Sequence, residues 1–60
     1  MDKVIYKIPV PVNQYIEVYE FDECWEWRLV ENGKVLEDTK NMQYGSPEYA
    51  LKDAINKYII

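Results

Sequence analysis

The apolar residues at the C-terminal end of the chain recur at steps of three and four, which places them along one side of a helix. They are Ala50, Leu51, Ala54, Ile55, Tyr58 and Ile59. Ser46 is a favourable N-cap, Pro47 is tolerated at the first helical position, and Glu48 suits the positive end of the helix dipole. The sequence therefore predicts one amphipathic helix over residues 46–60, whose apolar stripe requires a surface to pack on.

Upstream of this helix the pattern changes to an alternation with a period of two, which is typical of strands buried on one face. In the first such segment Val4, Tyr6 and Ile8 are expected to point toward the core. Pro9 and Pro11 limit the segment. Because proline donates no hydrogen bond to a neighbouring strand, this strand is expected at an edge of the sheet.

Two short turns organise the strands that follow. Asn32-Gly33 is the pair preferred in a two-residue type I′ hairpin, because both residues must adopt positive φ. Asp22-Glu23 is expected to form a turn of the same length. These turns separate three further predicted strands, at residues 14–21, 24–31 and from 34 onward.

Turns of even length determine which residues face each other across the strands. Leu29 is expected opposite both Ile16 and Leu36, and Val18 opposite Trp27. The face predicted beneath the helix comprises Ile16, Val18, Trp25, Trp27, Leu29 and Leu36. Both tryptophans are thus interpreted as core residues rather than as platforms for base stacking.

The opposite face of the same strands combines aromatic, aliphatic and charged residues. Arg28 is expected there between Glu17 and Glu37. An exposed surface of this kind marks a protein contact more often than chance exposure, and Tyr, Phe and Arg are enriched at interfaces. The alternative, that a loop, the first strand or the chain end covers this face, carries equal weight. The candidate partner-binding residues are Tyr15, Glu17, Tyr19, Phe21, Arg28, Val30 and Val35.

These patterns predict an α+β fold for a single domain over residues 1–60. The expected architecture is an antiparallel meander of three or four strands with the C-terminal helix packed on one face. A chain of this length buries only about 60% of the surface that its unfolded form exposes, so its stability is expected to be marginal. Association would add stability, which favours a homodimer without requiring one.

Composition argues against an enzyme. Histidine is absent, which removes the commonest general base and metal ligand. Cys24 is the single cysteine, so neither an intramolecular disulfide nor a thiolate metal cluster is expected, and an inert thiol is favoured over a reactive one. We therefore predict no catalytic residues, no metal site, no cofactor and no small-molecule ligand.

The charge of the chain bears on its partners. Seven basic and eleven acidic residues give a formal net charge of −4, and the basic residues are dispersed, so nucleic acid is not an expected partner. No stretch of about 20 apolar residues and no signal-peptide pattern occurs. We therefore expect no membrane partner, and we expect a cytoplasmic location.

A cluster of carboxylates surrounds the first predicted turn. It consists of Glu17, Glu20, Asp22, Glu23 and Glu26. The spacing does not match a calcium loop, and a solvated charged hairpin is the favoured interpretation. A surface that imitates the phosphates of a nucleic acid is the alternative.

The order strand, Asn-Gly turn, strand and Tyr44-Gly45-Ser46 before a helix, over Trp25 to Ile59, resembles the strand-strand-helix unit of the YegP-like family of small bacterial domains. The resemblance implies an antiparallel sheet with one helix and association through pairing of such units, with no established activity. This chain has one unit, preceded by an N-terminal extension over residues 1–13.

The same segment is similar to HicB antitoxins, whose helix follows a Ser/Thr-x-Glu-x-Ala start like that of residues 46–50. This second resemblance implies binding and neutralising a small RNase.

We expect a non-enzymatic protein-interaction module that binds a partner, or a second copy of itself, through the face of Tyr15, Tyr19 and Phe21. The alternative is an acidic inhibitor or antitoxin-like protein that binds a nucleic-acid enzyme, with Glu20, Glu23 and Glu26 as the residues to test.

Overall fold

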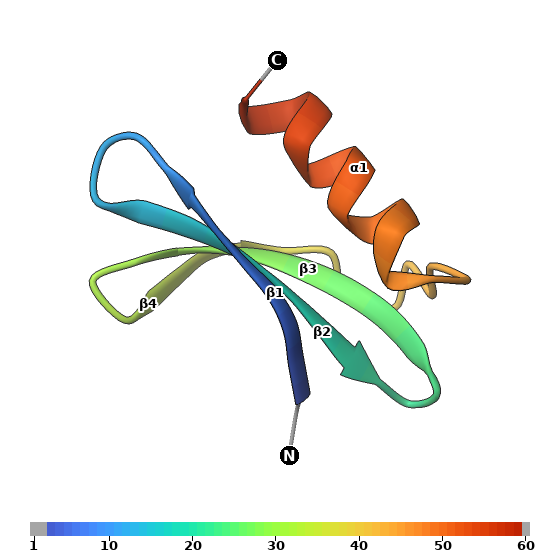
Figure 1. Cartoon of the computed structure of the whole chain (residues 1–60). Helices are drawn as coiled ribbons and strands as arrows, with labels where there is room; N and C mark the ends of the chain where they lie inside the picture. The colour runs from blue at the N-terminus through green and yellow to red at the C-terminus, as the bar shows by residue number, and fades with distance from the viewer. Residues whose placement is uncertain (1–2, 60) are drawn as a thin grey trace.

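The computed structural model describes residues 3–59, which form one antiparallel sheet and one helix (Figure 1). The elements follow in the order β1 (Lys3–Val10), β2 (Gln14–Phe21), β3 (Cys24–Glu31), β4 (Lys34–Asp38) and α1 (Pro47–Tyr58). Neighbouring strands in the sheet are also neighbours in the sequence, so the sheet is a four-stranded meander with β1 and β4 at its edges. The predicted α+β fold and the predicted edge position of the first strand are confirmed.

The helix begins as its sequence predicts. The Ser46 side chain accepts a hydrogen bond from the backbone N–H of Tyr49 at 3.3 Å, and Pro47 occupies the first helical position. The helix ends at Tyr58, and Ile59 closes it by donating its N–H to the Ile55 carbonyl at 2.8 Å. Ile60, which the predicted range includes, lies outside the described residues.

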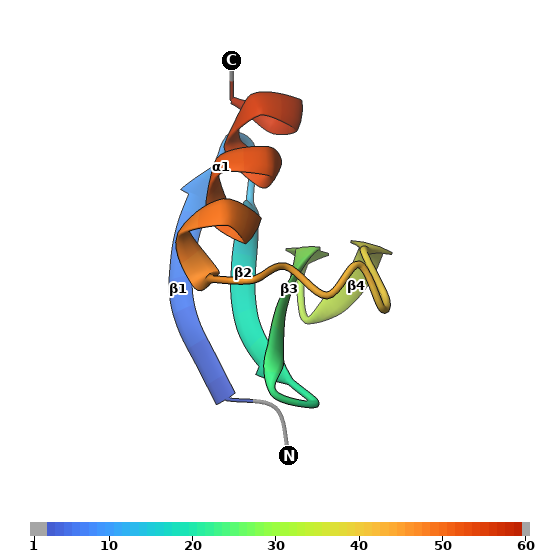
Figure 2. The same cartoon turned by 90° about the vertical axis from the view of Figure 1, so that its right-hand side faces the viewer.

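The helix packs across β1, β2 and β3 on one side of the sheet, and Figure 2 shows no second layer on the other side. Ala50 and Ala54 are fully buried at this contact, because their small side chains allow the helix to approach the strands closely. The buried core comprises Val10, Ile16, Val18, Trp27, Leu29, Ala50 and Ala54. The Trp27 ring meets the Tyr58 ring edge-on, with centroids 5.7 Å apart, a geometry favoured by aromatic quadrupoles.

The predicted register between β2 and β3 is confirmed. Ile16 lies opposite Leu29 and Val18 lies opposite Trp27. Both turns have the expected two residues with positive φ, at 52° and 77° for Asn32-Gly33 and at 54° and 66° for Asp22-Glu23. The second pair adopts the same backbone conformation without a glycine.

The predicted register between β3 and β4 is wrong by one residue. A bulge places Glu37 opposite Leu29 and Asp38 opposite Arg28, with Leu36 as the extra residue of β4. Leu36 is therefore not part of the core, and 47% of its surface is exposed. The helix does not reach over β4, although Lys57 forms an ion pair with Glu37 across the gap.

A second bulge corrects the prediction for β1. Val4 lies opposite Tyr19 and Tyr6 opposite Val18, so Ile5 is the extra residue and the strand changes face there. Val4 is 40% exposed rather than in the core. Tyr6 and Ile8 pack against the core as predicted, and the Tyr6 hydroxyl donates to Glu48 at 2.9 Å.

Candidate functional site: the open face of the sheet

The side of the sheet away from α1, which we call the open face, contains the candidate partner-binding residues. Strand pairing places them side by side: Tyr15 lies opposite Val30, Glu17 opposite Arg28, and Val30 opposite Val35. Tyr19 and Phe21 follow on β2 at the same period of two. The structure therefore brings all seven predicted residues to one face, which are Tyr15, Glu17, Tyr19, Phe21, Arg28, Val30 and Val35.

A chain of polar contacts crosses the middle of the open face. The Arg28 Nε donates to Glu17 Oε1 at 2.7 Å, which confirms the predicted pair. The guanidinium also lies 4.5 Å from the centroid of the Tyr19 ring, and the Tyr19 hydroxyl donates to Asp38 at 2.7 Å. Because of the bulge in β4, the carboxylate opposite Arg28 on that strand belongs to Asp38 and not, as predicted, to Glu37.

The open face is not uniformly exposed. Tyr19 and Val30 are only 5% and 4% exposed, whereas Phe21 and Val35 are 46% and 48% exposed. Tyr15 is half-buried, with the Lys7 ammonium 4.3 Å from its ring centroid. Of the seven residues, Tyr19 and Val30 are therefore the buried apolar contacts of this face, and Phe21 and Val35 are its exposed apolar side chains.

Part of the open face is covered by the connection between β4 and α1, which the buried carboxylate of Glu26 organises. Glu26 is 1% exposed and accepts hydrogen bonds from the Thr39 hydroxyl at 2.5 Å, the Met42 N–H at 3.1 Å and the Gln43 N–H at 2.9 Å. Successive backbone N–H groups that converge in this way form a concave anion site, which the protein's own carboxylate fills here.

Glu26 therefore corrects two predictions. It is not part of a solvated charged hairpin, and its carboxylate is not available to imitate a phosphate. Its position opposite the buried Tyr19, on the central strand β3, is the signal that sequence analysis did not use. A carboxylate between two strands needs donors, and the connection supplies them by adopting positive φ at Lys40, Asn41 and Gln43.

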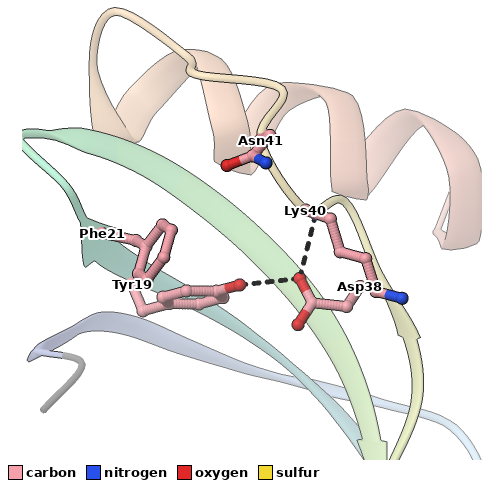
Figure 3. A pocket seen from close by; sticks show the side chains of 5 residues that line it. All are labelled: Tyr19, Phe21, Asp38, Lys40 and Asn41. Carbon is pink, nitrogen blue, oxygen red and sulfur yellow. Dashed lines mark hydrogen bonds between the residues drawn. The ribbon is translucent and has the colours of Figure 1, made fainter.

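A pocket of about 350 Å³ lies where this connection meets the open face (Figure 3). Its lining residues are Tyr19, Phe21, Asp38, Lys40 and Asn41. Sequence analysis predicted the two aromatic residues but missed Asp38, because of the bulge in β4, and missed Lys40 and Asn41, because the connection contains no recognisable motif. Only the folded chain brings it against β2.

Burial raises the pKa of the Tyr19 hydroxyl, and the hydrogen bond to Asp38 and the negative charges of Asp38 and Glu26 raise it further. The phenol is therefore neutral at physiological pH and acts as a hydrogen-bond donor to Asp38. A second hollow, of about 300 Å³, lies along one side of α1 at Leu51 and Ile55 and has only helix residues in its lining.

Residues 3–59 contain no group of three or more cysteine and carboxylate side chains placed to hold a metal ion, and Cys24 is a free, half-buried thiol. The helix α1 lacks the length and apolar composition that crossing a bilayer requires.

Comparison with protein-family models, with curated proteins and with solved structures gives no match to this chain.

Proposed function

We propose that this chain is a non-enzymatic protein-binding module whose docking surface is the open face of its sheet. The observation that carries the proposal is the exposure of Phe21 and Val35 on a sheet face that lacks a second layer. Large apolar side chains held at the surface of a sheet are typical anchors of protein contacts.

The buried part of the open face supports the proposal because it keeps this surface rigid. Arg28 is bound by Glu17 and stacks on Tyr19, and Tyr19 is bound by Asp38. Side chains that are already ordered lose little conformational entropy on binding. A partner would therefore meet a preformed surface with Phe21 and Val35 at its accessible positions.

The same surface allows a second copy of the chain as partner, which the small size and the YegP-like resemblance also favour. The acidic-inhibitor function is less well supported by the structure. Of its three residues, Glu20 and Glu23 are exposed, but Glu26 is buried and fully engaged by the connection.

The test replaces the accessible apolar residues. We expect the double variant Phe21→Ser/Val35→Ser to keep the fold, because both side chains are about half exposed. If the partner is a second copy, light scattering across a concentration series should show the wild type dimerising and the variant remaining monomeric. If it is another protein, cross-linking and mass spectrometry would identify it, and the purified partner should bind the variant at least about tenfold more weakly.

The matched control is Tyr49→Ser, which removes an aromatic side chain that is 65% exposed on the helix, away from the open face. This variant should associate as the wild type does. Equal association by the wild type and the folded double variant would contradict the proposal.

A further inference from the structure

The three aromatic residues of β2 on the open face differ in their charged neighbours. The ring of Tyr15 lies beneath the Lys7 ammonium at 4.3 Å, and the ring of Tyr19 lies beneath the Arg28 guanidinium at 4.5 Å. Phe21, the third, has no cation over its ring among residues 3–59, and it is the most exposed of the three. Two of the three aromatic rings on this face are therefore covered by cations of the chain itself, and the ring of Phe21, beside the pocket, is not.

Hydrogen-bond acceptors lie across the pocket from this ring. Asp38 Oδ1 accepts from the Tyr19 hydroxyl at 2.7 Å and from the Lys40 N–H at 3.2 Å, whereas Oδ2 accepts no hydrogen bond from residues 3–59. Figure 3 shows the Asn41 amide above the two aromatic rings and the Lys40 amino group directed away from them. The pocket therefore offers an aromatic wall, a carboxylate oxygen and an amide.

The electrostatic environment also favours a cation. The negative charges of Asp38 and Glu26 raise the pKa of the Tyr19 hydroxyl at the floor of the pocket, and the smaller, opposing effect of the Arg28 guanidinium does not cancel theirs. Arg28, whose guanidinium lies over the Tyr19 ring, is already bound by Glu17. The chain as a whole has a formal net charge of −4.

We propose that the Phe21 pocket binds an arginine side chain of a partner protein. The planar guanidinium would stack on Phe21 and donate to Asp38 and to the amide oxygen of Asn41, with its aliphatic stem against Tyr19. A guanidinium fits this arrangement better than an ammonium because it can stack and donate in its plane at the same time. This inference rests on the proposed function and names the chemistry of its partner.

The experiment uses the full chain labelled with ¹⁵N and a capped peptide, acetyl-Gly-Arg-Gly-amide, in an NMR titration at low salt. We expect saturable shifts of the backbone amides of Phe21, Lys40 and Asn41. The same peptide with citrulline, which has the shape of arginine without its charge, should not saturate these shifts. Raising the salt concentration should weaken arginine binding, because the pocket is partly exposed to solvent.

Two variants locate the binding. Asp38→Asn keeps an acceptor for the Tyr19 hydroxyl but removes the charge, and Phe21→Ala removes the stacking surface. Each should weaken arginine binding about two- to fivefold, the range for a partly exposed ion pair or cation–π contact. Asp22→Asn is the matched control, because it removes the same charge at a turn position, φ 54°, that asparagine tolerates. It should leave affinity within about twofold.

Equal binding of the arginine and citrulline peptides, or unchanged arginine binding by folded Asp38→Asn, would overturn the inference. Failure here is distinct from failure of the proposed function. If Phe21→Ser/Val35→Ser abolishes association while Asp38→Asn leaves it intact, the open face binds protein but the pocket holds no arginine.

Discussion

The two faces of the sheet are buried by different means. Beneath the helix, Ile16 and Val18 are completely buried in a mainly apolar core, and neither side chain has a polar group to satisfy. On the open face, Tyr19 and Glu26 are also buried, but Tyr19 is held by a hydrogen bond to Asp38 at the end of β4, and Glu26 is held by hydrogen bonds from the connection that leads from β4 to the helix. The helix face therefore supplies stability, and the open face supplies a positioned surface.

This difference explains why one short connection has two roles. Thr39, Met42 and Gln43 supply the donors that satisfy Glu26, and Lys40 and Asn41, which lie between them in the sequence, line one wall of the pocket beside Phe21. A purely apolar cover would bury Tyr19 equally well but would present no acceptors to a partner.

The largest effect is expected at the centre of the helix face. Trp27→Ala removes an aromatic side chain that is 4% exposed and loses its contact with Tyr58. Such truncations cost about 3–5 kcal/mol, which is a large share of the stability of a small domain. We expect the variant to be largely unfolded by circular dichroism at 25 °C.

Phe21→Ala is the matched change on the open face. Because Phe21 is 46% exposed, its truncation should cost about 1 kcal/mol or less in a urea titration. If Trp27→Ala and Phe21→Ala lowered the free energy of unfolding by similar amounts, the open face would be a second core and would not differ from the helix face in its contribution to stability.

A smaller but still substantial effect is expected at Glu26. Glu26→Gln replaces one carboxylate oxygen with an NH₂ group, which must face a donor, either the Gln43 N–H or the pair formed by Met42 N–H and the Thr39 hydroxyl. Leaving buried donors unpaired costs about 1–3 kcal/mol. Urea denaturation should show this loss. Relative to the wild type, the rate of amide hydrogen exchange should increase most at Met42 and Gln43.

Glu23→Gln is the control for that variant, since Glu23 is exposed in the turn before β3. It should change the free energy of unfolding by no more than about 0.5 kcal/mol. If both variants behave alike, the carboxylate of Glu26 does not organise the connection.

The same division between the faces decides what sequence analysis could find. Period-two alternation and two short turns were sufficient to predict the meander, the β2–β3 register and the helix, because these depend on local patterns. The bulges at Ile5 and Leu36 were missed, since neither position contains a glycine or another residue that marks an extra residue in a strand. A period of two then assigns Val4 and Leu36 to the wrong environment.

The candidate site divides in the same way. Its β2 and β3 residues follow from alternation, but Asp38 reaches the open face through the bulge in β4, and Lys40 and Asn41 reach the pocket only because the connection folds back onto Glu26. That contact joins positions far apart in the sequence and depends on positive φ at residues that tolerate it without requiring it. A polar stretch between two elements gives no indication of such a fold.

A small effect is expected on the open face itself. Tyr19→Phe keeps the ring beneath Arg28 but removes the hydroxyl that donates to Asp38. At pH 7 we expect a loss of about 1 kcal/mol in the free energy of unfolding, typical of one hydrogen bond.

The loss caused by Tyr19→Phe should also depend on pH. Because the pKa of Tyr19 is higher in the folded protein than its ordinary value near 10, the hydroxyl's contribution is complete below pH 10. Above pH 10 the unfolded chain ionises first, so the contribution falls as the pH rises toward the folded pKa. Urea titrations at pH 7, 10 and 11 should therefore show the wild type losing more stability than Tyr19→Phe between the last two values. The pKa of Tyr44 is also raised, by burial and by its hydrogen bond to Asp53. Ionisation of Tyr44 therefore lowers the stability of both proteins at alkaline pH by the same amount, and subtracting one stability from the other cancels this contribution. Parallel losses in the two proteins would mean that the Tyr19 hydroxyl is not held by Asp38, and the polar network that distinguishes the open face from the helix face would lose its central contact.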